Sequence, residues 1–150
     1  MFEALKEAQK ARKKGEVPIG CVIVRDNKII ARAHNRRHKL KNAVAHAEVL
    51  AIKKACKVVK DWRLQGCEMY VTLEPCPMCA GACFNARVDK VVYGATDVKG
   101  GVFGGALDLS DKNLLNHKIE VIGGVLKSEC EEQLKQFFKN VREAKSKHKS

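Results

Sequence analysis

Three potential metal ligands, each near the start of a predicted helix, constrain the fold of this chain more than any other feature. His46 opens the segment His46-Ala47-Glu48, and two cysteines lie in Pro75-Cys76-Pro77-Met78-Cys79. Imidazole and thiolate groups are the usual zinc ligands in proteins. Because His46 is distant in sequence from both cysteines, a shared metal site requires the fold to bring two helix N-termini together.

The spacing of Cys76 and Cys79 predicts that both sulfurs project to one side of the same helix start. Pro77 is tolerated just inside a helix N-terminus, so we expect a short helix over residues 77–85 with Cys76 at its cap. Backbone N–H groups are unpaired at this end of a helix. We therefore expect both thiols to have lowered pKa values, which favours metal binding. His46 is expected in the first turn of a second helix.

Glu48 is the candidate proton carrier beside this cluster. A structural zinc site is closed by four protein ligands, whereas a hydrolytic site leaves one position for water. With His46, Cys76 and Cys79 as metal ligands, Glu48 is free to take a proton from water and to return protons to the substrate. Alternatively, Cys83 could complete a closed Cys₃His site, which would leave Glu48 without a task. We interpret Cys83 as a core residue.

Composition and length narrow the class of protein. With 150 residues the chain is expected to form one domain over residues 1–150. No apolar run approaches the roughly 18 residues of a membrane span, and the N-terminus lacks the form of a signal peptide. Seven cysteines are an odd number, which argues for reduced thiols and metal ligands and against a disulfide framework. We expect a cytoplasmic protein without a membrane partner.

The net charge of +12 is the second informative property. Basic residues gather in residues 25–41 and again in the C-terminal segment, where Lys139, Arg142, Lys145, Lys147 and Lys149 face the single acid Glu143. Such a surplus attracts polyanions and gives salt-dependent binding. On its own, a run of charge is equally compatible with a solvated surface. Together with the metal-binding pattern, it favours a nucleic-acid substrate.

Hydrophobic periodicity predicts the order αββαβαβ…βα. Helices are expected over residues 2–14, 45–59 and 77–85, and from about residue 126 into the basic tail. Strands are expected over residues 19–24, 29–31, 67–73, 91–93 and 119–122, with Asp26 and Asn27 in the turn of an initial hairpin. A glycine-rich loop spans residues 94–105. This order predicts an α/β fold, a three-layer α/β/α sandwich around a five-stranded mixed sheet.

The pattern H-x-E…P-C-x-x-C is the signature of zinc-dependent nucleobase deaminases. Further segments extend the similarity over nearly the whole chain: residues 15–20, 34–36, 45–48, 73–82, 91–95, 97, 99–101, 116–117 and 137–138. The chain resembles the bacterial tRNA-specific adenosine deaminases of the zinc-dependent cytidine/deoxycytidylate deaminase superfamily. The resemblance implies a cytidine-deaminase-like fold, one Zn²⁺ per chain, a homodimer, and hydrolysis of adenosine 34, at the wobble position of a tRNA anticodon stem-loop, to inosine.

The same resemblance implies roles for individual residues. Asn35 would bond the flipped base or its sugar, and Asp97 would contact the ribose. Further substrate contacts are implied for Pro18, Ile19, Ala47, Leu73, Phe138 and Arg142. The sequence pattern alone, without this resemblance, suggests other roles: Asn35 as a turn residue, Asp97 as a hydrogen-bond partner of its own backbone, and Phe138 as a core residue.

Two other functions fit parts of the sequence. A deaminase of free guanine, cytosine or a nucleoside would share the zinc chemistry but has no need for a basic last helix. A zinc-stabilised RNA-binding module without activity would fit both the metal ligands and the charge. Substitution of Glu48 distinguishes the two functions, because only an enzyme needs this residue for turnover.

Overall fold

The computed structural model describes residues 1–111 and 114–149. For residues 148 and 149 it describes the backbone alone, so the predicted basic side chain of Lys149 lies outside the described part. Its centre is a five-stranded mixed sheet in the order β2-β1-β3-β4-β5. The strands are β1 (Gly20–Arg25), β2 (Lys28–His34), β3 (Cys67–Leu73), β4 (Lys90–Ala95) and β5 (Glu120–Ile122). β1 pairs antiparallel with both β2 and β3, and β4 pairs parallel with both β3 and β5. The predicted mixed sheet is confirmed.

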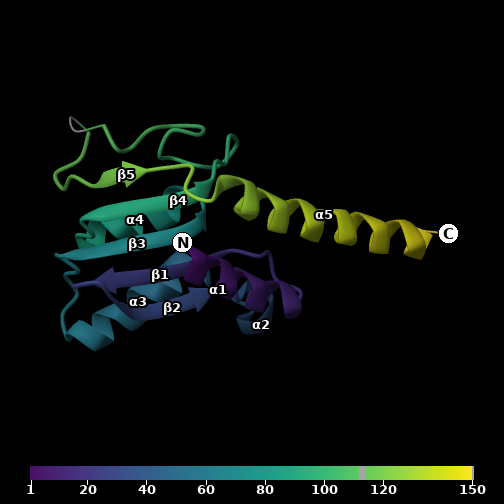
Figure 1. The fold of residues 1–150 in the computed structure, drawn as a ribbon, viewed down its shortest axis with the longest axis horizontal. Helices are drawn as coiled ribbons and strands as arrows, with labels where there is room; N and C mark the ends of the chain where they lie inside the picture. Colours follow the sequence, from purple (N-terminus) through teal and green to yellow (C-terminus); the bar gives the residue numbers. More distant parts are fainter. Residues whose placement is uncertain (112–113, 150) are drawn as a thin grey trace.

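Helices cover both faces of this sheet, as the three-layer prediction requires (Figure 1). α1 (Phe2–Lys13) and α5 (Lys127–Lys149) pack on one face and contact each other. α3 (Ala47–Val59) and α4 (Pro77–Ala86) pack on the other. Gly20 lets α1 approach, since a Cβ there would lie 2.0 Å from the Ala4 carbonyl oxygen. Gly94 does the same for α5, because a Cβ would lie 2.3 Å from the Cys130 sulfur.

Local sequence signals set most element ends as predicted. Asp26 and Asn27 both adopt positive φ angles, 51° and 61°, which a two-residue hairpin turn requires. Gly15, with φ of 77°, follows the end of α1. α3 begins at Ala47, so the expectation that His46 lies in its first turn is wrong: His46 is the N-cap residue, in an extended conformation. The four-residue helix α2 (Arg37–Leu40) carries no apolar periodicity and was not predicted.

Strand pairing gathers four chain segments at one edge of the sheet. The parallel pairing places Leu73, the last residue of β3, opposite Ala95, the last residue of β4. β1 runs antiparallel to its neighbours, so its first residue, Gly20, lies opposite His34, the last residue of β2. The segments before β1 and after β2, β3 and β4 therefore emerge side by side, and they contain most of the predicted site residues.

The core lies between the sheet and α3 and α4, and it consists mainly of aliphatic and cysteine side chains. The seven cysteines, all in the described ranges, are free thiols, as expected. No helix in residues 1–111 or 114–149 combines the length and apolarity that crossing a membrane requires. α5 leaves the body after its first turns and projects into solvent (Figure 1).

Candidate metal centre and substrate pocket

His46, Cys76 and Cys79 come together with metal-ligand geometry. Their ligand atoms all lie within 4.8 Å of one another. His46 Nδ1 is 3.7 Å from Cys76 Sγ and 3.5 Å from Cys79 Sγ. Zn–S bonds of about 2.3 Å and Zn–N bonds of about 2.0 Å at tetrahedral angles hold nitrogen and sulfur about 3.5 Å apart. The donor set and its spacing therefore fit zinc.

Two helix N-termini supply these ligands. His46 is the N-cap of α3, and Cys76 is the N-cap of α4, with Pro77 as the first helical residue. Both cap residues have extended backbones. Cys79 follows one turn later on the side of α4 that faces Cys76. α3 and α4 pack against each other, and this contact brings the two N-termini together.

The pKa values of the two cysteines shift in opposite directions. Hydrogen bonds from the Cys79 thiol and from His46 lower the pKa of Cys76 to about 4. The pKa of Cys79 is raised, first because its thiol is the donor to Cys76 and then by burial. The expectation of two lowered thiol pKa values is therefore right for Cys76 and wrong for Cys79. The hydrogen bond between His46 and Cys76 raises the pKa of His46, against the lowering effect of burial.

Glu48 lies beside the cluster and is buried, with only 4% of its surface exposed. Burial raises the pKa of its carboxyl to about 7, against the smaller lowering effect of a hydrogen bond from its own backbone N–H. Glu48 is not one of the three ligand residues that the cluster contains among the described residues. Its position is that of an acid or base next to a metal, where both protonation states are accessible near neutral pH.

Cys83 points away from the cluster into the core. It is fully buried, its thiol contacts Met69 Sδ at 3.7 Å, and burial raises its pKa above the range of ordinary thiols. The ligand cluster formed by the described residues does not include it. This environment supports the interpretation of Cys83 as a core residue.

Asn35 connects the end of β2 to the start of α3. Its side chain is buried, and its Oδ1 accepts a hydrogen bond of 2.9 Å from the Ala47 N–H. The Ile19 carbonyl in turn accepts a hydrogen bond from the Asn35 N–H. With Oδ1 engaged, the side-chain N–H₂ group of Asn35 has no hydrogen-bond partner within the described ranges. Asn35, Ile19 and Ala47 thus form one connected group between β1, β2 and α3.

Three more predicted substrate residues line one cavity of about 320 Å³. Leu73 comes from the end of β3, Asp97 from the loop after β4, and Phe138 from α5. Phe138 is 44% exposed and meets Phe137 edge to face, so it is not the core residue that periodicity alone suggests. Sequence reasoning missed the other lining residues, which are Val17, Thr96, Val98, Lys99 and Leu134. They are neighbours of predicted residues, in sequence or one helical turn away.

The remaining predicted contacts lie apart from this cavity. Pro18 is fully buried, and Arg142 is exposed on α5 one turn beyond Phe138. Neither lines the cavity within the part of the chain that is described. Asp97 Oδ1 accepts hydrogen bonds from the Lys99 and Gly100 N–H groups, so one carboxylate oxygen organises its own loop.

Sequence reasoning also gave no role to Glu74, which directly follows β3. Its carboxylate is buried and accepts hydrogen bonds from backbone N–H groups of the glycine-rich loop. The one indication in the sequence was an acidic residue directly after a predicted strand. Its partners lie more than twenty residues further along the chain, which is why the signal could not be interpreted.

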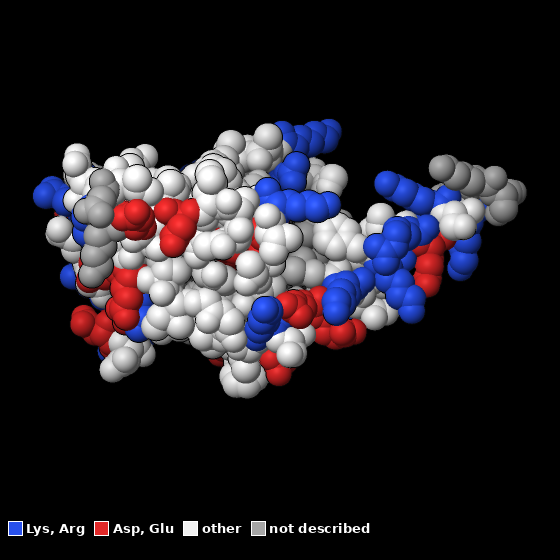
Figure 2. All heavy atoms as spheres, turned by 90° about the horizontal axis from the view of Figure 1, so that it is seen from above, with Lys and Arg blue, Asp and Glu red and all other residues white. Residues whose placement is uncertain are grey.

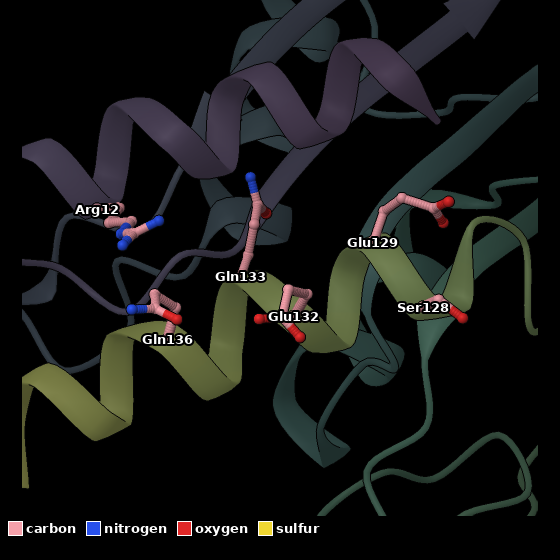
Figure 3. A pocket seen from close by; sticks show the side chains of 6 residues that line it. All are labelled: Arg12, Ser128, Glu129, Glu132, Gln133 and Gln136. Atoms are coloured by element: carbon pink, nitrogen blue, oxygen red, sulfur yellow. The ribbon is translucent and has the colours of Figure 1, made fainter.

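A larger cavity of about 660 Å³ lies between α1 and α5, beside the places where the two helices contact each other (Figure 3). The residues that line it are Arg12, Ser128, Glu129, Glu132, Gln133 and Gln136. Gln133 reaches from α5 towards α1, where its amide donates a hydrogen bond to the Leu5 carbonyl (Figure 3). No predicted site residue is among those that line it, so this cavity belongs to the packing of the two helices.

Comparison with known proteins shows that the chain is a deaminase. A sequence model of the MafB19-like deaminases matches residues 1–142, and the chain belongs to this deaminase family. The tRNA-specific adenosine deaminase of Bacillus subtilis is 54% identical over 145 residues, which cover 97% of this chain and 90% of the relative. Within the deaminases, the chain therefore belongs to the tRNA-specific adenosine deaminase family, whose superfamily uses zinc.

Solved structures agree with this assignment. One from a study of A-to-I editing by tRNA:A34 deaminases has a TM-score of 0.86 and 42% identity, covering 89% of this chain and 97% of that one. A guanine deaminase from Bacillus subtilis is also 42% identical, but with a TM-score of 0.61 it covers 63% of this chain and 61% of its own. The adenosine deaminase similarity thus extends over far more of the fold.

Metal analysis of two cysteine variants tests the ligand set. We expect Cys79→Ala to lose bound zinc, because a sulfur donor is removed, whereas Cys83→Ala keeps the wild-type metal content. Cys83→Ala should lower the free energy of unfolding by about 1 kcal/mol, as loss of a small buried group does. Metal loss from a folded Cys83→Ala protein would instead indicate the closed four-ligand site.

Proposed function

We propose that this chain hydrolyses the adenosine at position 34 of a tRNA anticodon to inosine, with release of ammonia. The observation that carries this proposal is the position of a buried Glu48 beside a cluster of three zinc-type ligands, at the sheet edge where Asn35 and the Leu73–Asp97 cavity also lie. The substrate named for the related deaminases of Bacillus subtilis and of the A34 study supports the choice of adenosine in tRNA.

In this proposal, His46, Cys76 and Cys79 hold one Zn²⁺ per chain. When bound, zinc supplies a Lewis acid that makes water nucleophilic near neutral pH. The donor set includes one imidazole and two sulfurs, and the deaminases that share the H-x-E and P-C-x-x-C pattern use the same combination. A fourth position would remain for a reactant, as a hydrolytic site requires.

Glu48 moves the protons of the reaction. It accepts a proton from the attacking water as the oxygen adds to C6 of the purine, and it passes this proton to N1. It then transfers the second proton from the new hydroxyl group to the amino group, which leaves as ammonia. Adenosine and water are consumed and inosine and ammonia are formed, with Glu48 returned to its starting state. Its burial keeps bulk water from exchanging these protons.

Substrate residues would act from two sides. The side-chain N–H₂ of Asn35, which no described residue engages, would bond the base or its sugar, while Asp97 and Phe138 line the neighbouring cavity. Anticodon-loop bases are largely unstacked, so extruding one costs little free energy. We further propose that the chain acts as a single catalytic domain, as a homodimer and in the cytoplasm. The similarity to tRNA-specific adenosine deaminases over nearly the whole chain supports this proposal.

An anticodon stem-loop assay tests the proposed substrate. We expect inosine to form from stem-loop RNA with adenosine at position 34 and no product from the same RNA with adenosine moved to position 37. Free adenosine, cytosine and guanine should be inert at equal concentration. Product from guanine alone would instead assign the chain to the activity of the guanine deaminases.

Glu48→Gln separates an enzyme from a zinc-stabilised RNA-binding module. The amide cannot accept the proton from water, so we expect the rate of inosine formation to fall by at least about 1000-fold. Zinc content and stem-loop affinity should match the wild type, because neither depends on the charge of this side chain. Undiminished turnover would contradict the assigned role.

Charge on the projecting part of α5 should attract the RNA backbone. Figure 2 shows Lys and Arg gathered along this helix, where Lys139 and Lys145 are exposed. We expect Lys139→Gln with Lys145→Gln to weaken stem-loop binding. The slope of log K against log salt concentration should fall by roughly 0.7 to 0.9 for each phosphate that the variant no longer neutralises. Lys53→Gln with Lys57→Gln, on the far face of the sheet, is the control and should leave the slope unchanged.

A further inference from the structure

Glu74 is a buried carboxylate whose partners are all backbone N–H groups. Only 2% of its surface is exposed, and no cationic side chain of the described residues pairs with it. Oε1 accepts a hydrogen bond of 3.0 Å from Asp97, and Oε2 accepts bonds of 2.8 Å from Phe103 and from Gly105. These three hydrogen bonds, all from one loop, make Glu74 the main anchor of that loop.

The loop is shaped to reach this carboxylate. A Cβ on Gly101 would lie 2.3 Å from the carboxyl carbon of Glu74. A Cβ on Gly105 would lie 2.2 Å from the Asp97 carbonyl oxygen and 2.6 Å from Glu74 Oε1. Real Cβ atoms do not approach other atoms so closely, so both positions require glycine. The glycines of the loop therefore serve contact with Glu74, and not only chain flexibility.

The segment that carries Glu74 also carries a predicted metal ligand. Cys76 lies two residues further on, and the intervening Pro75 accepts a hydrogen bond of 3.1 Å from the Val102 N–H. The loop thus attaches to this segment through four hydrogen bonds from three of its regions. Asp97, at the start of the loop, lines the cavity beside Leu73. Any shift of the loop relative to Glu74 moves Asp97 relative to Cys76.

We propose that Glu74 is a positioning residue, which fixes the loop of residues 97–105, and with it Asp97, at a set distance from the metal centre. The inference rests on the proposed function, in which Asp97 contacts the ribose of the target nucleotide. Glu74 itself touches neither substrate nor metal. It acts through Asp97, and a misplacement of about 1 Å at such a contact can cost about 100-fold in rate.

Glu74→Gln tests this role with little change in volume. The amide replaces one acceptor oxygen with a donor that faces backbone donors, so at least one loop hydrogen bond is broken. We expect faster hydrogen exchange at the Asp97, Phe103 and Gly105 amides, with unchanged exchange in α1 and β1. For the stem-loop, kcat/KM should fall about 10- to 100-fold, mainly through KM, at wild-type zinc content.

Glu7→Gln is the matched control. Glu7 is also buried, with 4% of its surface exposed, but it lies on α1 and forms an ion pair of 2.7 Å with Lys10. We expect loop exchange and KM to be unchanged in this variant. An equal rise in KM in both variants would show that loss of any buried carboxylate has this effect, and would overturn the proposal.

A double-mutant cycle with Asp97→Ala distinguishes positioning from stability. If Glu74 acts through Asp97, then Glu74→Gln should change KM less than about 2-fold in the Asp97→Ala background, because coupled residues are not additive. Additive losses of free energy, or activity that falls only in proportion to zinc content, would overturn the proposal.

Gly101→Ala approaches the same contact from the loop. Its Cβ would collide with the Glu74 carboxylate, so it should reproduce the faster loop exchange and higher KM even where Glu74→Gln folds poorly. The exchange measurement needs no substrate, and unchanged loop exchange in both variants overturns the inference. Absence of inosine formation by the wild-type protein would instead contradict the proposed function alone.

Discussion

The parallel pairing of β3 with β4 is the constraint on which the rest of the site depends. Parallel strands end on the same side, so Leu73 and Ala95 lie opposite each other and the segments that follow them run side by side. One segment contains Glu74 and Cys76, and the other contains Asp97. The antiparallel hairpin of β1 and β2 returns the chain to the same edge, with Ile19 before one strand and Asn35 after the other. Open α/β sheets bind ligands at the carboxyl ends of parallel strands for this geometric reason.

Burial of ionisable groups at this edge has a consistent physical logic. A buried charge is costly unless it is paired or hydrogen-bonded. Cys76 meets this requirement as a thiolate that accepts hydrogen bonds from the Cys79 thiol and from His46. Glu74 meets it with three backbone N–H groups, and Glu16 accepts hydrogen bonds from the backbone of His38 and Lys39. Glu48 accepts hydrogen bonds from its own backbone N–H and from the Cys79 thiol, but burial outweighs them and raises its pKa to about 7. This carboxyl, whose pKa lies near neutral pH, stands next to the candidate metal ligands.

The proposed chemistry and the proposed recognition of RNA lie in different parts of the molecule. The cluster and Glu48 lie at the starts of α3 and α4, inside the body of the fold. Phe138 and the exposed lysines belong to α5, which reaches the cavity with one turn and then projects away from the sheet (Figures 1 and 2). A long helix with a basic outer half suits a polyanion larger than the cavity, whereas a free nucleobase would need neither. The basic C-terminal segment and the metal-ligand motif are far apart in the sequence, and both fit a nucleic-acid substrate.

Local sequence determined the elements and the chemistry of the site, because periodicity, turn residues and ligand spacing are short-range signals. They predicted the strand Cys67–Leu73, the hairpin turn at Asp26 and Asn27, and Cys76 at a helix cap. They did not predict the four-residue helix α2, which lacks any period, or the place of His46 one residue outside its helix. Only the tertiary structure decided that Cys83 faces Met69 and that Phe138 faces a cavity, since both positions fit a core pattern equally well. The hydrogen-bond partners of Glu74 were likewise evident only from the tertiary structure. Hydrogen bonds between residues more than twenty positions apart depend on how strands pair, and strand pairing leaves no mark in either segment alone.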